Sequence, residues 1–151
     1  MTQIIETIDV HVPVSVAYNQ WTQLESFPDF LDEVESVTQV TDTETRWRVN
    51  IGGVDREFDA RITEQHPDER LAWTSTGGDT DHAGAVTFHR LSDDTTRVTV
   101  QLAWEPEGVV ETLGSFLGAG SHAVRKDLRN FKEFIERRGR ETGAWRGSVV
   151  A

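Results

Sequence analysis

Residue types that do chemistry are present in this sequence, but they lack the spacing of a catalytic or metal centre. No histidine lies four residues from another, and none shares a helical metal-binding motif with a carboxylate. Asp79, Asp81 and His82 stand together, yet a polar loop of an acidic protein gathers such residues by chance. We interpret this segment as a solvated loop and expect neither a metal ion nor a cofactor. The histidines are His11, His66, His82, His89 and His122.

Hydroxyl side chains give a similar result. Ser121 precedes His122 in the segment G-A-G-S-H, but a nucleophile elbow needs a second glycine after the serine and a strand before it. Tyr18 and Ser75 are expected to offer hydrogen bonds to a bound molecule. No acid, base and oxyanion donor can be assembled on one face, so the catalytic residues, if any, stay unknown.

Three charged residues bear on the interior. Glu6 falls on the apolar face of the first expected strand, where a charge needs a partner. Either it lies beyond the covered part of the sheet, or it is a polar anchor inside a cavity. Arg46 and Arg48 alternate with Trp47 and are therefore expected to face solvent.

A long helix over residues 105–139 is the element that must position these groups. Pro106 suits a first helical position, and Gly139 suits a C-cap. Its apolar stripe is interrupted around Ser121 by glycines, which predict a kink or break near residues 118–120 and an under-filled middle. The stripe comprises Val110, Leu113, Leu117, Val124, Leu128, Phe131 and Ile135, and the glycines are Gly114, Gly118 and Gly120.

The remaining chain alternates in the manner of strands. Residues 3–12 predict a strand, residues 14–21 a short amphipathic helix, and Pro28 a second helical turn. Strands with one apolar and one charged face then predict an antiparallel sheet, so the class is α+β with the helices on one side. These strands are residues 34–40, 45–51, 54–65, 70–76, 85–91 and 97–104, with a flexible loop over residues 77–84.

One domain is expected over residues 1–139, followed by a tail over residues 140–151. The tail either docks through Trp145 or frays.

Aromatic residues on the covered face suggest a pocket beneath the helix. Tryptophans give a large apolar surface with a few N–H donors, as in small-molecule sites. The alternative is that they fill the core, and the sequence leaves both open. The candidate lining residues are Tyr18, Trp47, Phe58, Trp73, Ser75, Phe88, Trp104, Leu113, Leu117, Ser121 and Val124.

The segment from Val12 to Leu31, together with Trp47, Trp73 and the runs G-A-V-T-F and E-P-E-G-V-V-E-T-L-G, resembles the START-like helix-grip (SRPBCC) superfamily. The closest branch is the polyketide cyclase/dehydrase and coenzyme Q-binding family. This resemblance implies a β-α-α-β6-α order, in which a curved antiparallel sheet of about seven strands wraps around the long C-terminal helix. It also implies a cavity for an apolar ligand.

Three functions follow from that resemblance. The first is an intracellular binding or carrier protein for a small hydrophobic molecule, such as a lipid, quinone or polyketide-like compound. The second is a cyclase/dehydrase-type lyase using the same cavity. The third is a ligand-free module that binds a protein partner.

Composition limits the classes of partner. The net charge of −11 argues against binding nucleic acid or an anionic membrane surface. The absence of cysteine excludes disulfides and thiol chemistry, and no apolar stretch is long enough to span a bilayer, so a cytoplasmic location is expected. An acidic, lysine-poor surface fits either a salt-rich cytoplasm or the codon usage of a GC-rich genome.

Overall fold

The structure is a computed structural model that describes residues 2–51, 54–78, 82–104 and 110–149. Side chains are described for residues 3–50, 55–78, 82–103 and 124–149.

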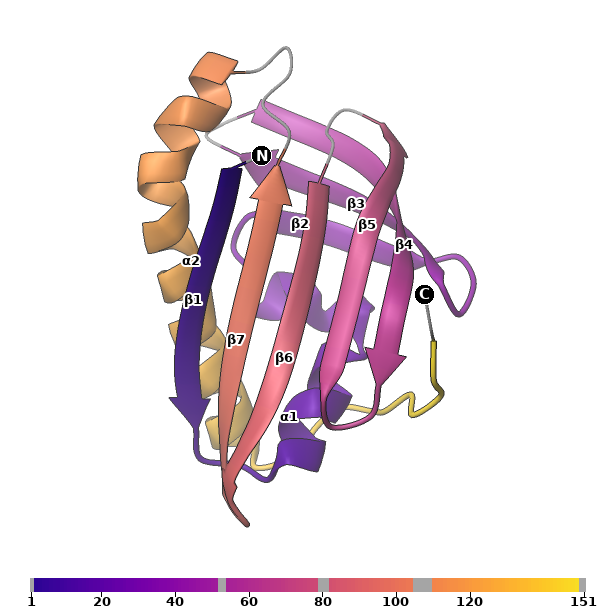
Figure 1. The fold of residues 1–151 in the computed structure, drawn as a ribbon, viewed down its shortest axis with the longest axis vertical. Coiled ribbons are helices and arrows are strands. Elements are labelled where there is room, and N and C mark those ends of the chain that lie inside the picture. Colours follow the sequence, from indigo (N-terminus) through magenta and orange to yellow (C-terminus); the bar gives the residue numbers. More distant parts are fainter. Residues whose placement is uncertain (1, 52–53, 79–81, 105–109, 150–151) are drawn as a thin grey trace.

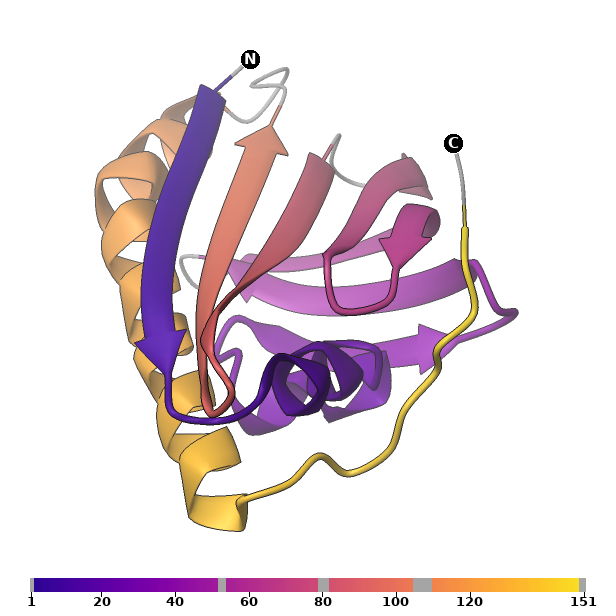
Figure 2. The same cartoon turned by 60° about the horizontal axis from the view of Figure 1, so that its bottom comes forward.

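The described residues form one seven-stranded antiparallel sheet that curls around the helix α2 (Figure 1). The strand order is β1-β7-β6-β5-β4-β3-β2, so the first strand pairs with the last. The short helix α1 and the 3₁₀ helix η1 lie together at one end of the sheet (Figure 2). The strands are β1 (Thr2–Val10), β2 (Val34–Gln39), β3 (Glu44–Ile51), β4 (Val54–His66), β5 (Arg70–Gly78), β6 (His82–Ser92) and β7 (Thr95–Trp104), and the helices are α1 (Val14–Trp21), η1 (Leu24–Asp29) and α2 (Val110–Arg138). The predicted α+β helix-grip fold is confirmed.

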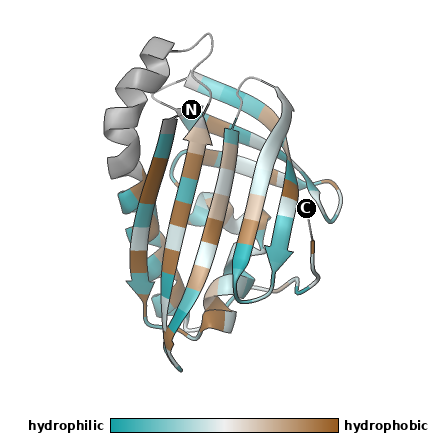
Figure 3. Cartoon of the chain, in the orientation of Figure 1, coloured by the Kyte–Doolittle hydropathy of each residue, from teal (hydrophilic) through white to brown (hydrophobic). Residues whose placement is uncertain are grey.

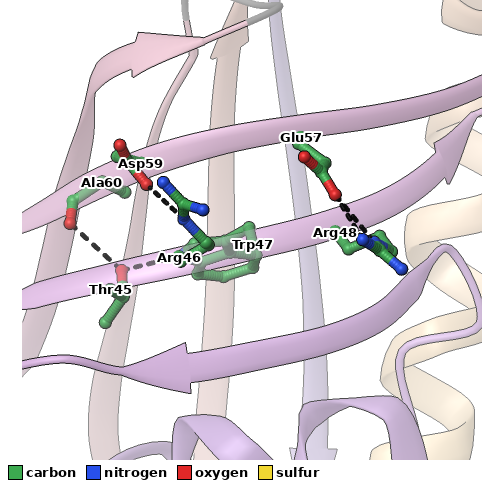
Figure 4. A network of polar contacts seen from close by, with 7 residues as sticks. All are labelled: Thr45, Arg46, Trp47, Arg48, Glu57, Asp59 and Ala60. Carbon is green, nitrogen blue, oxygen red and sulfur yellow. Dashed lines mark hydrogen bonds and ion pairs between the residues drawn. The ribbon is translucent and has the colours of Figure 1, made fainter.

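Alternation along the strands separates an inner face from an outer face (Figure 3). Trp47 on β3 lies opposite Phe58 on β4, and both are buried. Their chain neighbours point the other way, where Arg46 and Arg48 pair with carboxylates of β4 (Figure 4). Because side chains of a strand alternate between its two faces, this single register places aromatics inside and ion pairs outside. The predicted solvent-facing position of both arginines is confirmed.

The end of the fold that holds α1 and η1 is a filled core. The ring of Trp21 lies 5.3 Å from Phe27, 5.5 Å from Phe30 and 5.2 Å from Phe131 of α2. Such edge-on and tilted ring contacts add to the free energy of burying the apolar surface. This cluster fixes the C-terminal half of α2 against α1 and η1, and Ile135 of the predicted stripe is also completely buried.

Helix α2 runs from Val110 to Arg138 as one helix, so the break expected near residues 118–120 is wrong. Glycine in a helix costs about 1 kcal/mol per residue, a cost that packing of the whole helix can exceed. Gly139 ends the helix as predicted, with a φ of +76° and a hydrogen bond from its N–H to the carbonyl of Ile135. Pro106 and the side chains of Leu113, Leu117 and Ser121 lie outside the described part.

Most of the loop predicted over residues 77–84 is strand instead. Gly77 and Gly78 pair with β4, and β6 begins at His82. Gly78 has a φ of +115°, and a Cβ there would lie 2.6 Å from the carbonyl oxygen of Glu57, so only glycine fits this close approach. The glycines that predicted a loop are therefore residues of paired strands.

Residues 140–149 form a C-terminal strap that crosses α1 and reaches β4 (Figure 2). The N–H of Thr142 binds Oε1 of Gln20 at 2.9 Å, and the N–H of Trp145 binds Oγ1 of Thr22 at 3.0 Å. Val149 exchanges two backbone hydrogen bonds with Gln65 at 2.8 and 2.9 Å. The strap docks through its main chain and through side chains such as that of Arg146, which binds Asp68 at 2.9 Å, whereas the sequence had suggested docking through the tryptophan or fraying.

Candidate functional site

The inner face is not equally buried along its length. Tyr18 and Phe131, at the end that holds α1, have an exposed fraction of 0%. Phe58, Trp73 and Val100, on the same face nearer the start of β1, keep 5 to 6%, and Phe88 keeps 7%. These side chains are therefore nearly, but not completely, buried.

Three aromatic rings line this part of the inner face. Trp47 stacks on Phe58 with 5.5 Å between centroids and on Trp73 with 5.7 Å. The rings are nearly parallel, at 16° and 24°. They come from the adjacent strands β3, β4 and β5. Trp47 lies opposite Phe58 in the register, whereas Trp73 lies opposite Ile62 and meets Trp47 through its ring. They form a broad apolar wall, as expected for a site that binds flat or chain-like apolar molecules.

His82 adds a polar group to this wall. Its Nε2 accepts a hydrogen bond from the indole N–H of Trp73 at 3.2 Å, and its backbone N–H binds Oγ of Ser75 at 2.9 Å. Burial lowers the pKa of His82 to about 4, because desolvation disfavours the charged imidazolium. His82 is therefore neutral at pH 7. Its interpretation as a solvated loop residue was wrong.

Tyr18 contributes a buried hydroxyl at the α1 end of the same face. Its ring lies edge-on to Phe88 at 5.4 Å, and the guanidinium of Arg146 lies 5.6 Å from its centroid. The hydroxyl has no hydrogen-bond partner in the described part of the structure. Burial raises the pKa of Tyr18 because the phenolate would be poorly solvated.

The sequence-predicted site residues divide into three groups. Four of them meet on strands β3, β4 and β5. Tyr18, Phe88 and Val124 are buried and belong to the packed end of the face or to α2. For Trp104, Leu113, Leu117 and Ser121 the side chains lie outside the described residues. The four that meet are Trp47, Phe58, Trp73 and Ser75.

Glu6 forms an ion pair with Arg125 of α2, with 3.0 Å between Oε1 and Nε. Its side chain is only 14% exposed, so it lies under α2 and not beyond the covered part of the sheet. The pair joins the sheet edge to the helix, and Lys132 binds the carbonyl of Asp9 further along the same seam. This contact neutralises the carboxylate that the sequence placed on the apolar face.

Arg56 is an inner-face residue that sequence reasoning missed. It lies opposite Val49 in the register of β3 and β4, two positions before Phe58. The same alternation that identified Phe58, Ala60 and Ile62 includes position 56, and this signal could have found it. Among the described residues, no group of three or more histidines and carboxylates could hold a metal ion.

Comparison with known proteins places this geometry in a family. Residues 10–133 match the family model described as polyketide cyclase/dehydrase and lipid transport. The chain belongs to this family. A protein of Streptomyces lincolnensis, described as an uncharacterized 17.2 kDa protein in the melC2-rnhH intergenic region, is 53% identical over 150 residues, which cover 99% of this chain and 100% of that protein.

Solved structures agree with the family fold. A START superfamily protein from Mycobacterium smegmatis has a TM-score of 0.75 at 14% identity, covering 90% of this chain and 98% of that one. The Zhui aromatase/cyclase from Streptomyces sp. R1128 has a TM-score of 0.74 at 16% identity, covering 95% and 99%. At these identities the likeness establishes the fold. The polyketide cyclase/dehydrase and lipid transport family includes both enzymes and carriers, so function depends on the site.

No helix among the described residues is both long and apolar enough to cross a membrane.

Proposed function

We propose that this protein binds a small hydrophobic molecule between the inner face of its sheet and α2. The observation that carries the proposal is the aromatic wall of Trp47, Phe58 and Trp73, whose stacked rings lie side by side on the inner face of the sheet. Burying apolar surface contributes roughly 25 cal/mol per Å², so a ligand that covers this wall is held mainly by desolvation.

The polar groups beside the wall suit orientation of a ligand more than acid–base catalysis. The Nε2 lone pair of His82 already accepts the indole N–H of Trp73. With a pKa of about 4, the imidazole is a weak base at pH 7, whereas an efficient general base has a pKa near the working pH. A cyclase or dehydrase working in the same cavity is the alternative, and it requires proton transfer by other groups.

Native mass spectrometry of the purified protein tests the proposal, followed by organic extraction of any bound compound. We expect either a stoichiometric apolar ligand or, for an empty protein, saturable binding of the neutral fluorophore N-phenyl-1-naphthylamine. The absence of both would contradict the proposal and would favour a module that binds a protein partner.

A matched pair of variants locates the site. Val100→Phe adds bulk on the inner face and should reduce probe affinity about tenfold or more, since the filled volume is lost to the ligand. Thr99→Phe adds a similar bulk on the outer face, where Thr99 hydrogen-bonds Thr7, and should leave the affinity unchanged. Equal effects of both variants would place the binding site elsewhere.

A further inference from the structure

One side chain on the inner face is positively charged, and the apolar wall of Trp47, Phe58 and Trp73 does not explain its presence there. Arg56 lies on β4 directly opposite Val49, whose side chain is buried on the inner face. No register shift interrupts the pairing of β3 with β4, so Arg56 shares this face with Phe58 and Trp47. Its side chain is half-buried, which places it at the rim of the aromatic wall.

Arg56 makes no hydrogen bond and no ion pair within the described part of the structure. Its neighbours on the outer face behave differently, since Arg46 binds Asp59 at 3.1 Å and Arg48 binds Glu57 at 2.9 Å. Two arginines of the same hairpin thus bind carboxylates on the outer face. The inward one has no partner among the residues whose side chains are described.

The other charged groups described on the inner face do not compensate it. Glu6 is on β1, separated from β4 by three strands, and is bound to Arg125. His82, whose ring lies 5.5 Å from Phe58, is neutral at pH 7. A partly desolvated guanidinium without a counter-ion is unfavourable and gains free energy from any anion that reaches it.

We propose that Arg56 binds a carboxylate or phosphate group at one end of an otherwise apolar ligand. This inference rests on the proposed function and names the class of molecule bound: an amphipathic acid, with its chain along the wall of Trp47, Phe58 and Trp73. The planar guanidinium suits both anions because it donates two parallel N–H bonds to adjacent oxygens. The net charge of −11 disfavours anions at the protein surface, so their affinity has to come from a local cation.

Competition with bound N-phenyl-1-naphthylamine tests this at pH 8, with dodecanoate, dodecyl phosphate and uncharged methyl dodecanoate below their micelle concentrations. The wild-type protein should bind at least one of the anions about tenfold more tightly than the ester, as expected for a charge-assisted hydrogen bond. Comparison of the two anions shows whether the natural end group is a carboxylate or a phosphate. Equal affinity for ester and anions would overturn the inference.

Variants of Arg56 test whether this residue causes the preference for anions over the ester. Arg56→Gln should lose the preference for the anion while its affinity for the ester is unchanged, and Arg56→Lys should retain part of it because the charge remains. Arg61→Gln is the matched control, since Arg61 is exposed and lies on the same strand with its register on the outer face. Persistence of the preference in Arg56→Gln would overturn the inference.

The same experiment separates this inference from the proposed function. Binding of the ester and the fluorophore without an anion preference leaves the hydrophobic site intact and removes only the role of Arg56. Failure of the fluorophore and of every dodecyl compound to bind removes both.

Discussion

The indole N–H of Trp73 donates a hydrogen bond to Nε2 of His82 across 3.2 Å. The two residues lie on the neighbouring strands β5 and β6, and the backbone N–H of His82 also binds Ser75. This contact needs a neutral imidazole with its proton on Nδ1, because an imidazolium has no lone pair to accept with. The polar part of the candidate site therefore depends on the protonation state of one residue.

Acid should destabilise the protein through His82. Its pKa falls from an ordinary value of 6.5 to about 4 on folding, so the unfolded chain binds more protons between these values. The free energy of unfolding should therefore decrease as the pH falls from 6.5 to 4, by about 3 kcal/mol in total at 1.36 kcal/mol per unit. Urea unfolding of the wild-type protein and of His82→Gln measures the effect. The variant should lose this part of the pH dependence, whereas replacement of the exposed His89 by glutamine should retain it.

Gly84 should not tolerate a side chain. A Cβ at this position would lie 2.3 Å from Cζ2 of Trp73, so Gly84→Ala must displace the ring and should cost about 1–3 kcal/mol of stability. Gly77→Ala is the control, because a Cβ there meets no atom within 4 Å. Thermal unfolding and tryptophan fluorescence report both variants. Equal stability of the two would show that Trp73 is free to move.

Removal of the C-terminal strap should weaken the whole fold. Gln20 and Gln65 are buried and use the strap for hydrogen bonds, and each such bond contributes about 1 kcal/mol. A chain ending at Arg140 should lose on the order of 3 kcal/mol in urea unfolding. Trp145→Ala should cost less, because the contacts of this residue with Thr22 and Gln65 use its main chain. A larger loss in Trp145→Ala than in the truncated chain would contradict docking by the main chain.

Asp127→Asn should stabilise the protein. Burial, and then the neighbouring Glu33 carboxylate, raise the pKa of Asp127 well above its usual range. Because the folded state retains a proton that the unfolded chain releases, stability should fall as the pH rises above the ordinary range of an aspartic acid. Asparagine keeps the oxygen that accepts the N–H of Asp32 and removes the titration. We expect a gain of about 1 kcal/mol or more at pH 7, growing toward pH 9, and none for exposed Glu133→Gln.

Local patterns were sufficient for the strands and for half of α2. Trp47, Phe58 and Leu128 follow from alternation and helical spacing alone, and all three are buried as expected. In each of these elements one face packs against a single neighbouring layer, so the apolar pattern repeats within a short window of sequence.

The site was less accessible from sequence because its parts depend on tertiary pairing. His82 follows two glycines that indicate a loop, and only pairing of β6 with β7 makes it part of a strand. The strap has no apolar period, since its main chain binds side chains such as Gln20 that are remote in sequence. Such contacts leave no local signal.

The pairing of β1 with β7 has a consequence for how the chain reaches this structure. Glu6 lies opposite Val100, so the first strand made during synthesis has no partner until the last strand has been made. Pairings between distant segments carry a large loop-closure entropy and make folding slow. We expect β1 and β7 to pair late in folding, in the same step in which α2 packs against the sheet. Until then, an unpaired apolar strand edge remains available for pairing with other chains.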